Sequence, residues 1–165
     1  MKSKPILHGH KYEGVAVEQF ESKYSLKTYP CGLFVSTDHP QLGASPDRVI
    51  NDEEIVEVKC PYTAREHPVN PNTTPFLEKV GQSLQLKCNH DYYYQIQGQL
   101  FCSKRKLCNL VIYTFKEVVC VKVHRDEPFI QSMVEKLMQF YENFFKKAIL
   151  DEFFYKNYYK FNFDD

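Results

Sequence analysis

Two acidic residues and a lysine, Asp47, Glu57 and Lys59, are spaced in a way that can do chemistry on a phosphate. β-branched residues flank residues 51–53, and the Asn, Asp and Glu of that segment tolerate a tight turn, so the stretch is predicted to be a β-hairpin. Facing carboxylates repel each other, and a divalent cation between them relieves the repulsion, which leaves the lysine to act on whatever the metal binds. The pattern is typical of metal-assisted hydrolysis of a phosphodiester.

The register of this hairpin decides whether the three side chains meet. If the loop has three residues, Ile50 faces Glu54 and, counting outward, Asp47 lies directly opposite Glu57. Side chains alternate along a strand, so Glu57 and Lys59 share one face while the valines on either side of Glu57 take the other, toward a core. A slip of one residue would send the carboxylates to opposite faces.

Four blocks of sequence resemble, in order, the PD-(D/E)XK nuclease core in the form found in lambda exonuclease and the YqaJ-like viral recombinases. They are residues 9–16 (GHKYEGVA), 43–47 (GASPD), 56–62 (VEVKCPY) and 92–100 (YYYQIQGQL). The spacing D-x9-E-x-K alone would arise by chance on many solvated hairpins, but four ordered blocks are far more specific. Arg48 departs from the family pattern, which has glycine there. The start at Met1 also leads us to expect that the family's N-terminal helical segment is missing.

The resemblance implies one nuclease domain over residues 1–165 with Mg²⁺ or Mn²⁺ as cofactor. It makes Asp47 and Glu57 metal ligands, helped by the backbone carbonyl of Val58, and adds Glu13 from the first helix to the same shell. In a two-metal mechanism the ions lower the pKa of water and stabilise charge on the phosphate. Lys59 would orient or deprotonate that water, or neutralise the transition state.

Other polar residues are assigned to the network around the metal or to the substrate. Gln97 is expected to make a hydrogen bond in the catalytic network, and Gln95 to orient the substrate. The basic turn at residues 104–106 is the expected phosphate-binding patch, and two arginines near the hairpin are the closest basic candidates for contact with a DNA end. The expected DNA-binding residues are therefore Arg48, Arg65, Gln95, Lys104, Arg105 and Lys106.

Several elements must position these residues, and apolar periodicity predicts where they lie. A helix is expected over residues 7–24, and a strand or broken strand pair over 28–36 beside the central hairpin. A small hairpin is expected over 76–87, and a helix after Asp91 as N-cap. Residues 107–115 and 118–123 predict a second hairpin. A long amphipathic helix follows from Asp126, with its aromatic stripe in the core. Together these predict an α/β protein with a restriction-endonuclease-like core, in which helices flank a mixed central sheet of about five strands.

Composition narrows the class of protein. The charge is balanced, with 21 basic and 21 acidic residues, so contact with DNA must come from a local patch and from metal ions rather than from a basic coat. Six cysteines without a C-x-x-C pair indicate reduced thiols and an intracellular protein. No apolar run approaches the roughly 20 residues of a membrane span, so no membrane partner is expected.

The expected function is that of a 5′→3′ exonuclease on double-stranded DNA, of the recombination type, which hands the exposed strand to a single-strand annealing protein. Two alternatives stay open. One is a catalytically weak or inactive module that keeps the nuclease fold and binds DNA or protein, and the other is an endonuclease or an RNA-degrading relative. Assembly into a homo-oligomer is left open as well.

Overall fold

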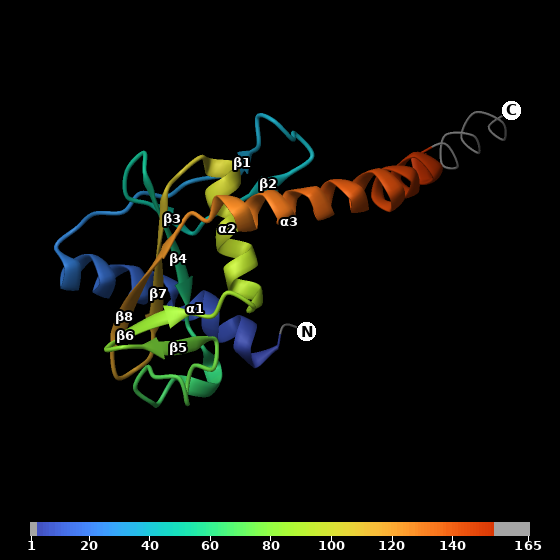
Figure 1. Cartoon of the computed structure of the whole chain (residues 1–165). Coiled ribbons are helices and arrows are strands. Elements are labelled where there is room, and N and C mark those ends of the chain that lie inside the picture. Colours follow the sequence, from blue (N-terminus) through green and yellow to red (C-terminus); the bar gives the residue numbers. More distant parts are fainter. Residues whose placement is uncertain (1–2, 154–165) are drawn as a thin grey trace, which may run out of the picture. The chain divides into compact units, whose positions relative to one another are not determined.

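The computed structural model describes residues 3–153, and the tail from residue 154 onward lies outside them (Figure 1). The chain forms two compact units, Met1–Asp126 and Glu127–Asp165. The first unit carries every residue for which a role in chemistry or DNA binding was expected, and the second carries the C-terminal helix.

The central sheet of the first unit has four strands in the order β3-β4-β7-β8. They are β3 (Arg48–Val49), β4 (Glu54–Lys59), β7 (Leu107–Tyr113) and β8 (Val118–His124). β4 and β7 are parallel, whereas β3–β4 and β7–β8 are antiparallel, so the sheet is mixed as predicted.

The sheet has one strand fewer than expected because residues 28–36 do not form a continuous strand. Tyr29 pairs with Val49 through a single bridge. The next residue is Pro30, which has no N–H to donate to a ladder. Further along, β1 (Phe34–Val35) pairs with β2 (Gly43–Ala44) in a separate two-stranded sheet. Residues 28–36 therefore form the broken strand that was one of the two expectations, and the prediction of three adjacent full strands was wrong.

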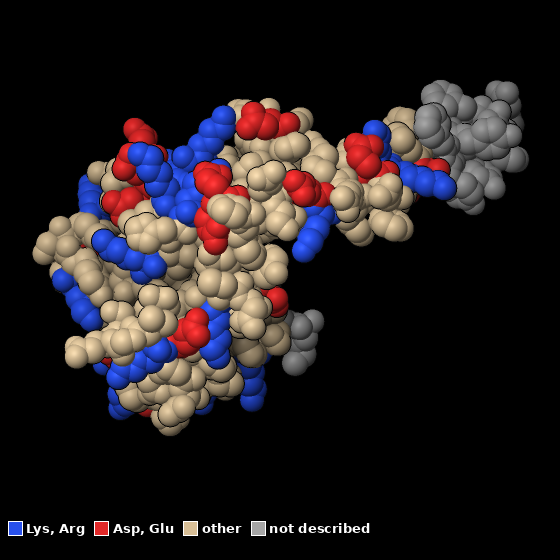
Figure 2. All heavy atoms as spheres, viewed as in Figure 1, with Lys and Arg blue, Asp and Glu red and all other residues tan. Residues whose placement is uncertain are grey.

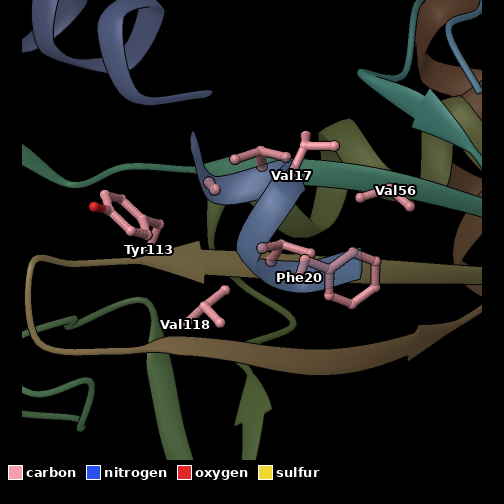
Figure 3. Close-up of a cluster of buried hydrophobic side chains, with 8 residues drawn as sticks. Val17, Phe20, Val56, Tyr113 and Val118 are labelled. Carbon is pink, nitrogen blue, oxygen red and sulfur yellow. The ribbon is translucent and has the colours of Figure 1, made fainter. Parts of the chain in front are cut away.

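Helix α1 (Lys4–Tyr24) covers one face of the sheet. Its apolar stripe packs on valines of β4, β7 and β8 and on Tyr113, as Figure 3 shows for Val17, Phe20 and Val56. The helix begins before the predicted residue 7, since the first turn tolerates Pro5. It ends where Ser25 takes a left-handed conformation with φ of 52°.

Helix α2 (Asp91–Ser103) covers the opposite face with buried Ile96 and Leu100. The N-cap is His90, whose Nδ1 accepts a hydrogen bond from the Tyr92 backbone N–H at 3.1 Å, and not Asp91 as predicted. Between β4 and α2 lie a short 3₁₀ helix, η1 (Tyr62–Ala64), and the predicted small hairpin of β5 (Leu77–Val80) and β6 (Ser83–Leu86). Gly81 supplies the positive φ of 61° that the hairpin turn needs.

The second unit consists of α3 (Glu127–Phe140), a π-helical turn η2 (Tyr141–Phe145) and a further helical stretch to residue 153. The aromatic stripe was expected to be core. Its far end is exposed, with Phe140, Phe144 and Phe145 at 56%, 65% and 51%, so the prediction was wrong for that part of the helix. In the part of the chain that the structure describes, no helix has the length and apolar character needed to cross a membrane.

Candidate active site

The register of the β3–β4 hairpin is the one that the sequence predicts. Arg48 pairs with Val56 and Val49 with Ile55, and the Ile50 N–H donates to the Glu54 carbonyl at 3.1 Å. Extending this register by one position sets Asp47 opposite Glu57. The two carboxylates therefore meet on the α2 side of the sheet, while the neighbouring valines pack under α1.

Glu57 is 3% exposed, and hydrogen-bond donors surround its carboxylate. Oε1 accepts from Lys59 Nζ and from Gln95 Nε2, both at 2.7 Å, and Oε2 accepts from Gln99 Nε2 at 2.8 Å. Gln95 closes a small ring, since its own Oε1 accepts from Lys59 Nζ at 3.0 Å. A buried carboxylate is costly unless it is paired and hydrogen-bonded, and this network meets that requirement.

Asp47 is held less favourably than Glu57. Its Oδ2 accepts a hydrogen bond from the Val58 backbone N–H at 2.7 Å. Burial, and then the charge of Glu57, raise the pKa of Asp47 from 3.8 to about 6, with a smaller contribution from Glu13. The hydrogen bond from Val58 and the charge of Lys59 offset only part of that rise. Two facing carboxylates thus destabilise each other in the absence of a cation.

A cleft of about 560 Å³ opens beside Lys59. Its walls come from the start of α1, the end of β4, the segment before β5 and the first turn of α2. The Lys59 ammonium lies 4.4 Å from the centre of the Tyr92 ring, at one wall of the cleft. Gly9 contributes to the lining from α1, and a Cβ added there would meet nothing within 4 Å. The aromatic rings of the cleft belong to Tyr62, Phe76 and Tyr92.

Gln97 is placed away from the expected catalytic network, whereas Glu13 lies near Asp47. Gln97 is fully buried, but its Nε2 donates to the His124 carbonyl at 2.8 Å and its Oε1 accepts from the Asp126 N–H at 3.0 Å. Gln97 therefore links α2 to the end of β8. The hydrogen bond to the site that was expected of Gln97 is made instead by Gln99, which donates to Glu57. Glu13 is near enough to raise the pKa of Asp47. However, no cluster of three or more His, Cys, Asp or Glu with metal-binding spacing occurs among residues 3–153.

The two arginines expected to contact DNA differ in where they lie and what they contact. Arg48 alternates with Asp47 and so faces the α1 side, where it assists hydrogen bonds from Thr28 in lowering the pKa of Glu21. The Arg65 guanidinium stacks 4.1 Å from the centre of the Tyr62 ring, and its Nη1 donates to the Tyr62 carbonyl at 2.6 Å. Arg48 thus lies away from the carboxylates, and Arg65 backs a wall of the cleft.

The basic turn is partly occupied by contacts within the protein. Arg105 Nε donates to the Asn51 carbonyl at 3.0 Å, and Lys106 forms an ion pair with Glu53. Both contacts tie the end of α2 to the β3–β4 turn, at the opposite end of the helix from Gln95. Lys104 is exposed and ends α2 in a left-handed conformation with φ of 57°. On the face in Figure 2, basic and acidic side chains are interspersed over the first unit.

The donor set fits a hard divalent cation. Asp47 and Glu57 offer carboxylate oxygens, the type of ligand that Mg²⁺ and Mn²⁺ prefer. Burial and then the charge of Glu57 raise the pKa of Asp47, and a cation between the two carboxylates would offset both effects. Lys59 and Gln95 now hold Oε1 of Glu57, and both side chains reach the accessible side of the site. Lys59 and Gln95 would move away from this oxygen when a cation binds.

The spacing of the glutamines along α2 could have identified Gln99, which was not assigned to the site from the sequence. Gln95 and Gln99 lie four residues apart, on one face of α2, and both donate to Glu57. Gln97 lies on another face. The aromatic lining of the cleft had no such local signal, because Tyr62, Phe76 and Tyr92 come from three separate segments.

Solved structures share this fold. The crystal structure of LHK-Exo in complex with dAMP matches with a TM-score of 0.75 and 21% identity, over 95% of this chain and 75% of that one. An alkaline exonuclease (LHK-Exo) from Laribacter hongkongensis matches at 0.63 and 22%, over 90% and 76%. A phage-related exonuclease from Haemophilus somnus 129PT matches at 0.66 and 13%, over 90% and 75%. The fold is therefore the one seen in alkaline and phage-related exonucleases.

Sequence comparison places the chain more closely. Residues 1–106 match the model of the YqaJ-like viral recombinase domain, and the chain belongs to that family. Among curated proteins, uncharacterized protein R354 of Acanthamoeba polyphaga mimivirus is 23% identical over 114 residues. That match covers 67% of this chain and 20% of the mimivirus protein, so the chain spans a small part of that relative's length.

Proposed function

We propose that this protein is a divalent-metal-dependent exonuclease that hydrolyses phosphodiester bonds of duplex DNA from a 5′ end. The observation that carries the proposal is the buried Glu57 carboxylate, set opposite Asp47 and paired with Lys59 at the mouth of a cleft. Membership of the YqaJ-like family and the shared exonuclease fold support it. The polarity and the use of duplex DNA rest on the family resemblance.

Asp47 and Glu57 would hold the metal, together with the Val58 carbonyl that the family resemblance implies. When bound, Mg²⁺ or Mn²⁺, in two copies in the expected mechanism, would supply an acidified water and neutralise charge on the phosphate. The chain's own contribution is position: the hairpin fixes the spacing of the carboxylates, and α2 fixes the rotation of Glu57 through its glutamines. Glu13 adds negative charge near Asp47.

Lys59 would act by its charge. Its three contacts, with a carboxylate, an amide oxygen and the face of a tyrosine ring, are all contacts that an ammonium group makes. From this position it would stabilise negative charge that develops on the phosphate. We therefore favour electrostatic stabilisation over proton abstraction for Lys59.

The cleft would receive the strand being cut. Its volume of about 560 Å³ lies in the range of pockets for small molecules, which suits an unpaired nucleotide rather than a duplex. Aromatic faces such as those of Tyr62 and Tyr92 stack on bases without regard to sequence. Cleavage should therefore show little sequence preference, and it should require a DNA end at which the base pairs can separate.

A second candidate is a nuclease-fold module that binds DNA without cutting it. It is favoured by the contacts of Glu57, whose two oxygens already accept three hydrogen bonds. In such a module the donors to Glu57, which are Lys59, Gln95 and Gln99, would stay in place and a cation would not bind. DNA would then bind equally well with and without metal.

One experiment separates these functions. Linear and covalently closed duplex DNA, labelled at the 5′ or the 3′ end, is incubated with Mn²⁺, Mg²⁺ or EDTA. An exonuclease releases 5′ label first from linear DNA only, and EDTA abolishes the reaction. Nicking of closed circles indicates an endonuclease, and cleavage in EDTA rejects the metal. Binding without cleavage in every condition supports the inert module.

A further inference from the structure

Gln99 differs from the other two glutamines of α2 in what its amide does. Its Nε2 donates to Oε2 of Glu57 at 2.8 Å and also lies 3.4 Å from the Ser45 carbonyl, within hydrogen-bonding reach. Its side chain is 2% exposed, whereas Gln95 on the same face is exposed. Gln99 is thus the interior contact of Glu57, and it also reaches the segment that leads into Asp47.

The orientation of the Gln99 amide follows from its neighbours. Both groups beside Nε2 are acceptors, so the reversed amide would set an oxygen against a carboxylate and a carbonyl. In the orientation that results, the buried Oε1 of Gln99 has no hydrogen-bond partner among the described residues. Gln97, by contrast, is satisfied at both ends of its amide. The position of Gln99 therefore satisfies the contacts of its Nε2, at the free-energy cost of leaving its buried Oε1 without a hydrogen bond.

The two oxygens of Glu57 are consequently unequal. Oε2 faces the interior and is bound by a buried side chain in the middle of a helix. Oε1 faces Lys59 and Gln95, which reach the cleft or the solvent and can exchange for another partner. Only one of the two oxygens is thus free to change its contacts without disturbing packed residues.

We propose that Gln99 is a positioning residue that holds Oε2 of Glu57 and the segment at Ser45, so that Glu57 offers Oε1 to the metal opposite Asp47. The inference rests on the proposed function, because it gives Glu57 the role of a metal ligand. Gln99 acts through Glu57 and touches neither metal nor DNA. Partners of this kind typically change metal affinity or activity by roughly 10- to 100-fold when removed.

The test compares two buried glutamines of the same helix. Gln99→Met removes the donor to Glu57, and Gln97→Met removes an equally buried amide whose hydrogen bonds go to the backbone of His124 and Asp126. Mn²⁺ affinity is measured by calorimetry, and kcat and KM on linear duplex DNA in parallel. We expect Gln99→Met to weaken Mn²⁺ binding and lower kcat by roughly 10-fold or more with KM for DNA unchanged. Gln97→Met should lower thermal stability and leave the Mn²⁺ affinity within about twofold.

Two results count against the inference. An unchanged Mn²⁺ affinity and kcat in Gln99→Met rejects it, and equal losses in both variants assign the effect to the fold. If Gln99→Met does not fold, Gln99→Asn keeps the amide but withdraws it by one methylene, and it should show the same loss in smaller degree. If wild-type protein binds no Mn²⁺, the metal in the proposed function fails. The crystal structure of Gln99→Asn or Gln99→Met then decides, because Glu57 must turn from its position opposite Asp47.

Discussion

Asp47→Asn should make the metal-free protein more stable at neutral pH, although it removes an expected metal ligand. The aspartate is partly buried beside Glu57, and these surroundings raise its pKa from 3.8 to about 6. Asparagine has the same shape, and its side-chain oxygen can still accept the Val58 N–H. The substitution therefore removes the partly buried charge and its repulsion by Glu57, and it keeps the hydrogen bond.

The sign of the effect depends on pH. Below about pH 3.8 the carboxyl is protonated in both the folded and the unfolded chain, so it contributes no penalty. Between 3.8 and about 6 the unfolded chain releases the proton while the folded chain keeps it, and the wild-type protein loses stability as pH rises. Above about pH 6 the penalty is complete.

The free-energy penalty of ionising Asp47 in the folded protein follows from its two pKa values. The difference between 3.8 and about 6 corresponds to about 3 kcal/mol. Solvent screens a carboxylate that is only partly buried, so we expect about 1–2 kcal/mol. For a chain of this size each kcal/mol moves Tm by about 2–4 °C.

Thermal unfolding in EDTA at pH values from about 3.5 to 8 measures the difference between variant and wild type. Asp52→Asn is the matched control, since it removes an acidic group from the exposed turn of the same hairpin. A gain for Asp47→Asn that appears only as pH rises supports the reasoning. A difference that is independent of pH, or a loss at pH 8, refutes it.

Adding Mn²⁺ should reverse the order of the two proteins. A ligand at about 100 times its Kd stabilises the form that binds it by about 2.7 kcal/mol, which exceeds the expected penalty. Wild-type protein should then be the more stable, while Asp47→Asn stays where it was. A Tm that Mn²⁺ raises equally in both proteins would mean that Asp47 is not a ligand.

The other predictions concern the charge of Lys59, the cleft beside it and the basic turn at residues 104–106. Lys59→Met should lower kcat by about 10²-fold and leave Mn²⁺ affinity intact or improved, and equal loss of both would contradict its electrostatic role. Gly9→Leu should fill the cleft and raise KM for DNA, whereas Gly14→Leu in the same helix should not, and thermal unfolding should show both at least as stable as wild type. Lys104→Gln should reduce the salt dependence of DNA binding by about 0.9, measured by titration at several salt concentrations, and an unchanged slope would move the DNA path elsewhere. Arg105→Gln should instead lower Tm, because its guanidinium holds the β3–β4 turn.

Several features of the site follow from the sequence because they are local. The hairpin register needs only the length of the loop, and alternation along β4 then sets Glu57 and Lys59 on one face. The same alternation separates Arg48 from Asp47. The four-residue spacing of Gln95 and Gln99 on α2 also indicates which glutamines can reach one carboxylate.

Tertiary structure decided what joins segments that are distant in the chain. Whether a glutamine of α2 meets Glu57 or the end of β8 depends on how the helix is rotated on the sheet, and that rotation is set by packing of Ile96 and Leu100. The basic turn looked like a phosphate site, but the fold brings it to the β3–β4 turn, where acceptors hold two of its three cations. The cleft beside Lys59 likewise exists only because α1, β4 and α2 converge there, since no single segment contains its walls.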